Sequence, residues 1–293
     1  MRARETVGII GKLDYKNAKV KLLYWALFAA LILISLVCLL PPIWVMLSSL
    51  KDIQEFFAVP PTIVPTSLHF EKLWETWKLL NFSKLYLNTL IMTVGTVVFA
   101  VTFNGLMGYF LSKLRPRGSG IVFLLVLWTM LLPNTIGMVP IFKNIIDFPL
   151  LGVNLTNTFL PMWMMAGANA FYVIVFKGFF DGIPHALVEA ARIDGGSDLG
   201  IFFKIMVPLS MPVIMAITIF TINGTWADFF WPYMVLKDKN LWTVIVAIFN
   251  LKGTVPMDIQ FIALTFSIIP PALLFLFFQR YILQGFTFSG IKG

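Results

Sequence analysis

Residues 85–112 read LYLNTLIMTVGTVVFAVTFNGLMGYFLS, a run without a single Asp, Glu, Lys or Arg. An α-helix rises about 1.5 Å per residue, so about 20 apolar residues cross the roughly 30 Å hydrocarbon core of a bilayer. This run is long enough to do so. It predicts a transmembrane helix, and the rest of the chain repeats the pattern.

Five other stretches also lack charged residues: 22–47, 120–142, 158–176, 205–227 and 259–279. The chain has 293 residues, of which 59% are hydrophobic and only 12% are charged, whereas soluble domains average about 25% charged residues. We therefore expect an all-α integral membrane protein with six transmembrane helices. The first run is too long for the core of a cleaved signal peptide, so we expect it to be retained.

The basic residues predict the orientation. Of the 22 Lys and Arg, 14 lie on one side: before the first run, between the second and third, between the fourth and fifth, and after the sixth. The other 8 lie on the opposite side, together with 8 of the 14 acids. Cytoplasmic segments carry the excess of Lys and Arg, so both termini are expected in the cytoplasm. This predicts a cytoplasmic segment at 1–21, a membrane domain at 22–285 with a charged loop at 181–208, and a cytoplasmic tail at 286–293.

Several chemistries have no support in the sequence. No G-x-x-x-x-G-K-[ST] motif is present to bind nucleotide phosphates. His69 and His185 are expected on opposite sides of the membrane, so we predict no metal site, and no acid–base set indicates an enzyme. The pI of 9.6 reflects topology and does not indicate a nucleic-acid partner. Anionic lipid head groups are the expected partners of the lysines.

The polar residues inside the uncharged runs are neutral. Ion-coupled carriers usually keep acids or histidines there, because such groups are expensive in the membrane and persist for function. An amide-lined path instead favours a neutral polar solute. The amides are Asn88, Asn104, Asn134, Asn169, Asn223 and Gln260.

Prolines recur in or beside the runs, and proline kinks a helix because it lacks the amide hydrogen. The kinks are compatible with bent helices around a central cavity and equally with ordinary packing irregularity. The prolines concerned are Pro41, Pro42, Pro133, Pro140, Pro161, Pro208, Pro212, Pro270 and Pro271.

Two outer loops are expected. Residues 48–84 include Trp74 and Trp77, whose spacing predicts a short amphipathic helix that anchors at the membrane surface. Residues 236–258 form the second loop, which we expect to be an exposed connection.

The charged loop 181–208 predicts two short helices. Pro184 fits the first turn of a helix over 184–194, with Asp181 near its positive end. Gly195 and the glycine after it provide the stop, and Ser197 caps a second helix.

The first of these helices has one stripe of small or apolar side chains, formed by Ala186, Ala190 and Ile193, with Glu189 beside it. Small side chains permit close approach by another backbone. The loop therefore looks like a surface on which a partner docks, although an ordinary interfacial hairpin with a solvated acid is the simpler alternative.

The same residues resemble a known family. Residues 189–197 read EAARIDGGS and are followed by Phe203, Ile205, Pro208 and Pro212. The pattern resembles the cytoplasmic loop of the membrane-spanning subunits of bacterial ABC importers, most closely the carbohydrate-uptake permeases of the maltose-transporter type. Further similar segments are Leu87-Asn88-Thr89, Gly108-Tyr109, Pro133 and Pro140, WADFFWP at 226–232, and the tail at 290–293. Two departures are Gly196, where the family usually has Ala, and Ala227, where Asn is common.

The resemblance implies a permease subunit of an ATP-driven sugar or oligosaccharide importer. Its partners would be a homologous second permease, two cytoplasmic ATPase subunits and an extracellular or periplasmic solute-binding protein. ATP and Mg²⁺ would be bound by the ATPase, and this chain would hold no cofactor. The residues implied to couple to the ATPase are Glu189, Ala190, Ala191, Asp194, Gly195 and Pro208.

On this reading, amides and an aromatic ring would hold the sugar along the path, and exposed charges of the second outer loop would contact the binding protein. The path candidates are Asn134, Asn223 and Trp226, and the loop candidates are Lys237, Asp238 and Lys239. Two alternatives stay open: an ion-coupled secondary carrier, disfavoured by the uncharged runs, and a membrane-embedded transferase, disfavoured by the missing acid–base set.

Overall fold

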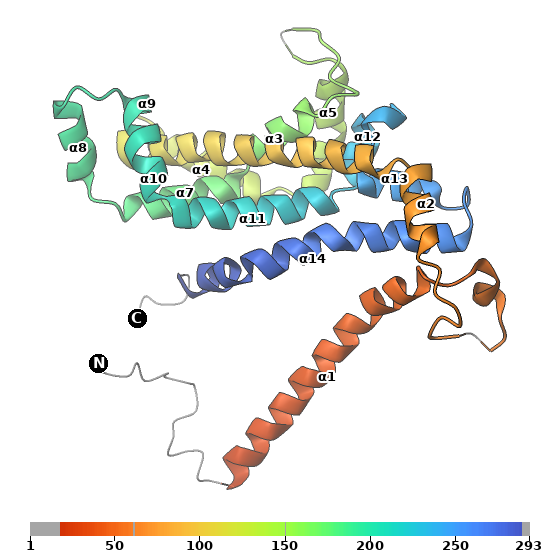
Figure 1. Ribbon diagram of the computed structural model, residues 1–293. Coiled ribbons are helices and arrows are strands. Elements are labelled where there is room, and N and C mark those ends of the chain that lie inside the picture. The colour runs from red at the N-terminus through yellow and green to blue at the C-terminus, as the bar shows by residue number, and fades with distance from the viewer. Residues whose placement is uncertain (1–17, 61, 150, 289–293) are drawn as a thin grey trace. The chain divides into compact units, whose positions relative to one another are not determined.

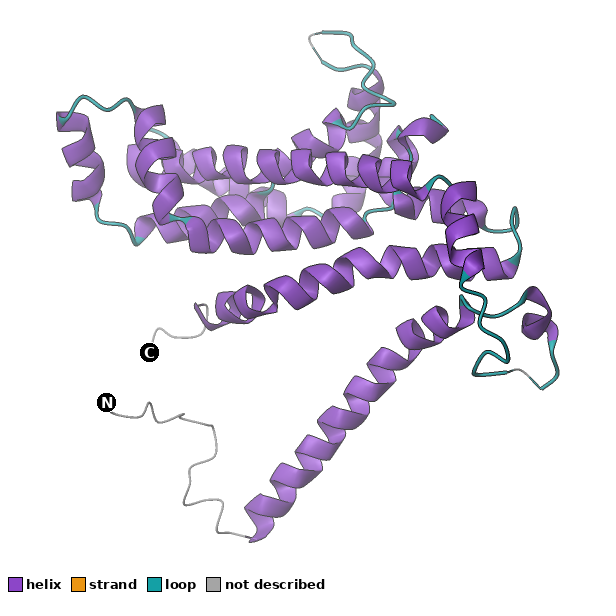
Figure 2. Cartoon of the chain, viewed as in Figure 1, coloured by secondary structure: helices purple, strands orange, loops and turns teal. Residues whose placement is uncertain are grey.

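The computed structural model describes residues 18–60, 62–149 and 151–288, although the side chains of Asn134 and of 280–288 lie outside the described set. Within these ranges every regular element is a helix, which confirms the all-α class (Figures 1 and 2). In chain order the elements are α1 (Ala18–Ser48), η2 (Ile53–Phe57), α2 (Glu71–Leu79), α3 (Phe82–Tyr109), η3 (Phe110–Leu114), α4 (Ser119–Leu131), α5 (Asn134–Ile146), α6 (Leu160–Gly167), α7 (Ala170–Asp181), α8 (His185–Ile193), α9 (Asp198–Ile201), η4 (Phe202–Met206), α10 (Val207–Leu209), α11 (Met211–Ala227), α12 (Phe230–Val235), η5 (Lys239–Leu241), α13 (Val244–Leu251) and α14 (Met257–Phe288).

Three helices of the described part are long and apolar enough to cross a membrane without interruption. They are α1, the continuous stretch Phe82–Leu114 formed by α3 and η3, and Met257–Gln279 of α14. Three further candidates are helix pairs with a sharp bend: α4 with α5 at 108°, α6 with α7 at 44°, and α9–α10 with α11 at 82°. Counting each bent pair as one span gives the six spans that the sequence predicts.

The bends correct the predicted third and fifth spans, which are not straight helices. At the 108° bend Leu132 is extended (ψ 128°) and Pro133 precedes the first turn of α5; a residue before proline disfavours the helical conformation. At the 82° bend Ser210 leaves helical geometry (ψ 8°), so residues 205–209 belong to the segment that precedes α11.

Proline does not explain every interruption. The 44° bend occurs at Ala168 and Asn169, where no proline is present. Conversely, the pairs Pro41-Pro42 and Pro270-Pro271 lie inside uninterrupted helices, so the kinks expected there are not breaks.

Contacts divide the chain into two compact units, which we describe separately. The first consists of the described parts of Met1–Leu73 and Pro256–Thr265. Its α1 has no buried side chain in its most apolar window. In its outer part the Lys72 ammonium lies 2.6 Å from Asp52 Oδ1 and 3.1 Å from Asp258 Oδ2, which ties the segment after α1 to the start of α14.

The second unit consists of the described parts of Trp74–Val255 and Phe266–Gly293. Its central helix is α3, which packs against α6, α7 and α11. Small residues allow this close packing: a Cβ at Gly95 would overlap the Trp163 ring, and one at Gly108 would lie 2.7 Å from the Phe176 Cβ.

The predicted helix with Trp74 and Trp77 is present as α2, but the two rings differ in role. Trp74 is exposed. The Trp77 ring stacks on Phe82 and Tyr86, and its Nε1 donates to Ser83 Oγ at 3.0 Å. Trp77 is therefore a packing residue, which the expectation of a pair of surface anchors did not foresee.

Candidate functional site

Helix α8 is fixed to the rest of the second unit mainly through one buried side chain. Val188 is completely buried (0% exposed) and belongs to a hydrophobic cluster with Phe176, Phe180 and Phe202. Ala191, one turn further along, is partly buried against the same cluster. These contacts attach α8 to the ends of α7 and η4, and leave its other face free.

The free face of α8 carries Ala186, Glu189, Ala190 and Ile193, all exposed. Their spacing of i, i+3, i+4 and i+7 places them on one side of the helix. Ile193 is 87% exposed, and the Glu189 side chain is 66% exposed with one ionic neighbour, His185 Nδ1 at 3.5 Å. The predicted stripe of small residues with a carboxylate beside it is therefore present.

The end of α8 is a Schellman motif. Gly195 has φ +79°, its N–H donates to Arg192 O at 3.0 Å, and the N–H of Gly196 donates to Ala191 O at 2.9 Å. This is the paired bond pattern that satisfies the last carbonyls of a helix. The predicted stop at Gly195 is confirmed, with Asp194 as the C-terminal cap residue.

Gly196 also has a steric reason to lack a side chain. A Cβ there would lie 2.8 Å from the carbonyl oxygen of Ala191. The alanine usual in the family would require a backbone shift in this loop, so the departure noted in the sequence fits the local geometry.

The predicted second helix is α9. Ser197 caps it, with Oγ accepting from Gly200 N at 3.2 Å. Arg192 of α8 donates to Asp198 Oδ1 through Nη2 at 2.9 Å, which joins the two short helices. Pro208, the last of the residues implied to couple, lies exposed in α10.

The start of α8 differs from the prediction. Pro184 is the N-cap residue, so the helix begins at His185. Asp181 is the last residue of α7, and instead of lying at the positive end of α8 it accepts hydrogen bonds from Ser112 (2.7 Å), Lys177 (2.7 Å) and Arg115 (3.2 Å).

This acid-centred cluster joins the end of α3–η3 to the end of α7, immediately before α8. Lys113 adds to it by donating to Ile183 O. Sequence reasoning missed the cluster, because Ser112 and Asp181 are 69 positions apart and nothing local links them. Its effect is to hold the base of α8 firmly against the membrane spans.

Several amides proposed for the solute path are structural instead. Asn88 donates to the carbonyls of Asn240 (2.8 Å) and Trp242 (3.0 Å). Asn104 donates to Ala166 O at 2.8 Å and accepts from Asn169 N at 2.9 Å, so it satisfies the backbone groups freed at the 44° bend. In lipid such groups need partners within the protein.

The three path candidates have separate environments. Asn223 is exposed on α11 and its amide donates to Ile219 O at 3.0 Å. Trp226, one turn further, donates through Nε1 to Ser267 O at 3.1 Å and lies 5.8 Å from the Tyr86 ring. Asn134 is the first residue of α5, and its side chain lies outside the described set. Asn223 and Trp226 thus share helix α11 but have different partners, and Asn134 lies on another helix.

The second outer loop is more ordered than expected. Residues 236–258 contain α13, whose Val244, Val246 and Ala247 are buried and which packs against α3. The exposed parts lie on either side of α13: a stretch around Lys237, Asp238 and Lys239 before it, and residues 252–254 after it. The eight-residue helix is too short to resemble a span, so its burial was missed.

Within the exposed stretch the charged residues differ. Asp238 accepts from the backbone N–H of Asn240 at 2.9 Å and so shapes the turn. Lys237 lies over the Tyr233 ring at 5.4 Å, and Lys239 lies over the Trp242 ring at 5.8 Å. Lys237 also donates to Tyr233 O at 3.2 Å, and neither lysine forms an ion pair with a described residue.

Comparison with known proteins decides the family. The family described as "Binding-protein-dependent transport system inner membrane component" matches residues 104–287, more than half of the chain. The chain belongs to this family. The matched range includes α8 and the whole charged loop 181–208, which confirms the importer resemblance seen in the sequence.

Relatives of this inner membrane component are similar over nearly their whole length. The chain is 31% identical over 275 residues to the arabinooligosaccharides transport system permease protein AraQ of Bacillus subtilis, covering 92% of this chain and 95% of that protein. It is 29% identical over 258 residues to the diacetylchitobiose uptake system permease protein NgcG of Streptomyces coelicolor, covering 87% and 84% respectively.

A solved structure shares the fold. It belongs to a bacterial ABC transporter involved in the import of the acidic polysaccharide alginate, and it matches with a TM-score of 0.79, covering 90% of this chain and 98% of that one at 24% identity. The inner membrane component described here is thus a multi-pass permease subunit of an ABC importer. It works within a multi-subunit complex, in which a separate subunit hydrolyses ATP.

Proposed function

We propose that this permease subunit carries a sugar or oligosaccharide, and that α8 couples its spans to a cytoplasmic ATPase. The observation that carries the coupling role is the division of α8 into two faces. Val188 anchors the helix to the core, while Glu189 and the small residues beside it stay exposed. An exposed carboxylate between alanines suits charge-assisted hydrogen bonds from a partner that approaches closely.

The solute class rests on the relatives. Both full-length relatives described above are named for oligosaccharides. The neutral side chains of Asn223 and Trp226, one turn apart on α11, are compatible with such a solute, because an amide can bond hydroxyls and an indole face can stack on a sugar ring. The second permease would supply the rest of the path.

The proposed orientation places α8 and both termini in the cytoplasm, since the excess of Lys and Arg lies on that side. Two ATPase subunits, one for each permease, would then bind the coupling loops and hold ATP and Mg²⁺. On the outer side a solute-binding protein would deliver the sugar, with Lys237 and Lys239 near its docking surface.

The test is reconstitution of the whole complex in proteoliposomes, with ATP inside and the binding protein with labelled oligosaccharide outside. Glu189→Ala should abolish ATP-driven uptake and release the ATPase on purification, since truncating one member of a desolvated charge pair typically costs about 2–5 kcal/mol. Glu75→Ala is the matched control, because Glu75 is also an exposed glutamate on a short helix.

Two outcomes separate the parts of the proposal. Wild-type uptake and ATPase binding by Glu189→Ala would remove the coupling role. ATP-driven uptake of another solute class, with no oligosaccharide bound by the binding protein, would remove the sugar assignment and leave the coupling role intact.

A further inference from the structure

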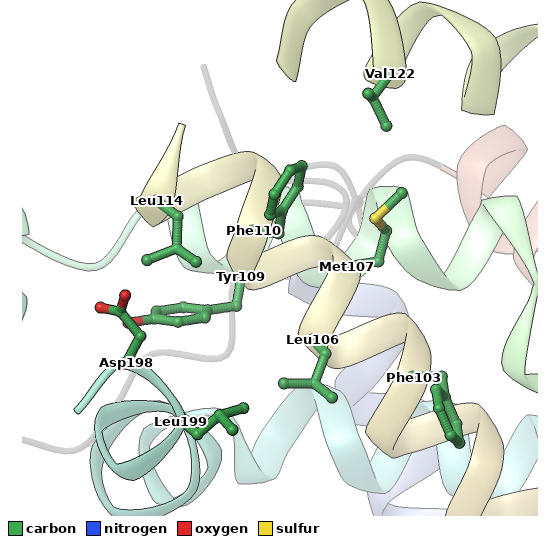
Figure 3. Close-up of a pocket in the computed structure, with 9 residues that line it drawn as sticks. All are labelled: Phe103, Leu106, Met107, Tyr109, Phe110, Leu114, Val122, Asp198 and Leu199. Atoms are coloured by element: carbon green, nitrogen blue, oxygen red, sulfur yellow. The ribbon is translucent and has the colours of Figure 1, made fainter. Parts of the chain in front are cut away.

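A hollow of about 510 Å³ opens between α3–η3, α4 and α9 (Figure 3). Its walls are apolar: Leu106, Phe110 and Leu114 come from α3–η3, Val122 from α4 and Leu199 from α9. Within the described residues nothing fills it. An apolar hollow of this size on a membrane protein indicates a binding site for an apolar group.

One polar group in its lining lacks a partner. Tyr109 is 2% exposed, and its hydroxyl makes no hydrogen bond with any described residue. Figure 3 shows its ring between Leu114 and Leu199, with the hydroxyl directed toward Asp198.

Two walls of the hollow are joined by a basic turn. The turn Arg115–Gly118 connects Leu114, which lines one wall, to the helix that carries Val122. Arg117 in this turn is exposed and forms no ion pair with a described residue, whereas Arg115 pairs with Asp181. On the third wall Asp198 is neutralised by Arg192, so it does not oppose a bound anion.

We propose that this hollow holds an acyl chain of an anionic phospholipid, whose phosphate head group is bound by Arg117. The walls supply the apolar contact, and the turn supplies the positive charge at the depth where a span ends. Basic pockets between spans bind anionic head groups in this way.

The site has a consequence for coupling, because Leu199 belongs to α9 and α9 is joined to α8 by the Arg192–Asp198 pair. A bound lipid therefore contacts the segment next to the coupling helix. Its binding itself does not depend on the solute or on the coupling role proposed above.

The test uses the complete complex, incubated with phosphatidylglycerol that carries a diazirine in its acyl chain. After illumination, peptide mapping should place the label on 103–122 and 198–199. Native mass spectrometry should show retained phosphatidylglycerol in preference to phosphatidylcholine. Arg117→Gln should lower this retention roughly fivefold, the equivalent of about 1 kcal/mol for one basic residue near an anionic surface.

Val122→Trp should fill the hollow and abolish the label, whereas Leu125→Trp, an exposed position on the same helix outside the lining, should not. Lys143→Gln, which removes another exposed cation, controls for charge. If Val122→Trp does not assemble, the wild-type label map and Arg117→Gln decide alone. The proposal would be overturned by labelling at other sites or by equal retention of both lipids. It would also be overturned if Val122→Trp lost a partner subunit and kept its lipid.

Discussion

At Gly108 of α3 the backbone of α7 is very near, because a Cβ there would lie 3.0 Å from the backbone nitrogen of Lys177. Backbone cannot move aside as a flexible side chain can. We expect Gly108→Ala to destabilise the complex by about 1–3 kcal/mol, the usual range for overpacking. The measurement is the midpoint of thermal unfolding of the detergent-solubilised complex.

Gly178 lies in α7 with open space around it, since a Cβ at this position would have no neighbouring atom within 4 Å, and this makes it a matched control. Gly178→Ala should be neutral or stabilise by roughly 0.5–1 kcal/mol, because alanine loses less backbone freedom in a helix. Equal effects of the two substitutions would show that the contact at Gly108 is not tight.

Gly195 poses a different test. Its φ of +79° restricts which residues can replace it, whereas a Cβ at this position would have no neighbouring atom within 4 Å. Asparagine visits this region more readily than a β-branched residue does. We therefore expect Gly195→Asn to keep most of the uptake and Gly195→Val to lose most of it. Gly195→Asp, which adds a charge at the proposed interface, should also abolish uptake. If Gly195→Val retains wild-type uptake, the conformation of this stop does not matter for coupling.

At the scale of elements, the ion pairs of Lys72 with Asp52 and Asp258 predict that the stability of this outer segment depends on pH. The hydrogen bond from Lys72, followed by that from Ile53 N–H, holds the pKa of Asp52 below its ordinary value of 3.8. A lowered pKa in the folded state means that the contribution to stability is present above the ordinary value and is lost as the pH falls through the lowered one.

Lys72→Met should therefore reduce protection of the amides of 50–60 and 62–72 at pH 7, as measured by hydrogen exchange. The difference from the wild type should shrink once the pH falls below the pKa of Asp52. Lys78→Met is the control, since Lys78 lies on the same helix over the Trp74 ring and forms no ion pair among the described residues. A difference that grows toward acid pH would contradict the assigned tie.

The elements also show what the sequence can predict. Uncharged runs locate the spans because membrane insertion depends on local composition, and the glycine stop of α8 is equally local. The bend at Asn169 does not depend on local sequence, because its hydrogen-bond partner Asn104 lies 65 positions away. The same holds for Asp181 and for the burial of α13. The roles of Glu189, Asn223 and Trp226 depend on other chains and stay predictions.

At the scale of the whole molecule, the energy source for uptake distinguishes an ATP-driven importer from an ion-coupled carrier. The six candidate spans are poor in ionisable groups, so we expect uptake in proteoliposomes to stop without ATP and to continue when ionophores collapse all ion gradients. Measurement of labelled solute under both conditions checks this. Uptake that ionophores abolish while ATP is maintained would contradict it and favour an ion-coupled carrier.

Asn104 has a mechanical consequence. Because one amide of α3 bonds both sides of the break between α6 and α7, we expect the bend to resist hinge motion. Val188 of α8 packs on Phe176 and Phe180 of α7. A torque applied to α8 is therefore expected to turn α3, α6 and α7 together. Little of the motion should then be absorbed at the 44° bend, so that a displacement of α8 is passed on to α6.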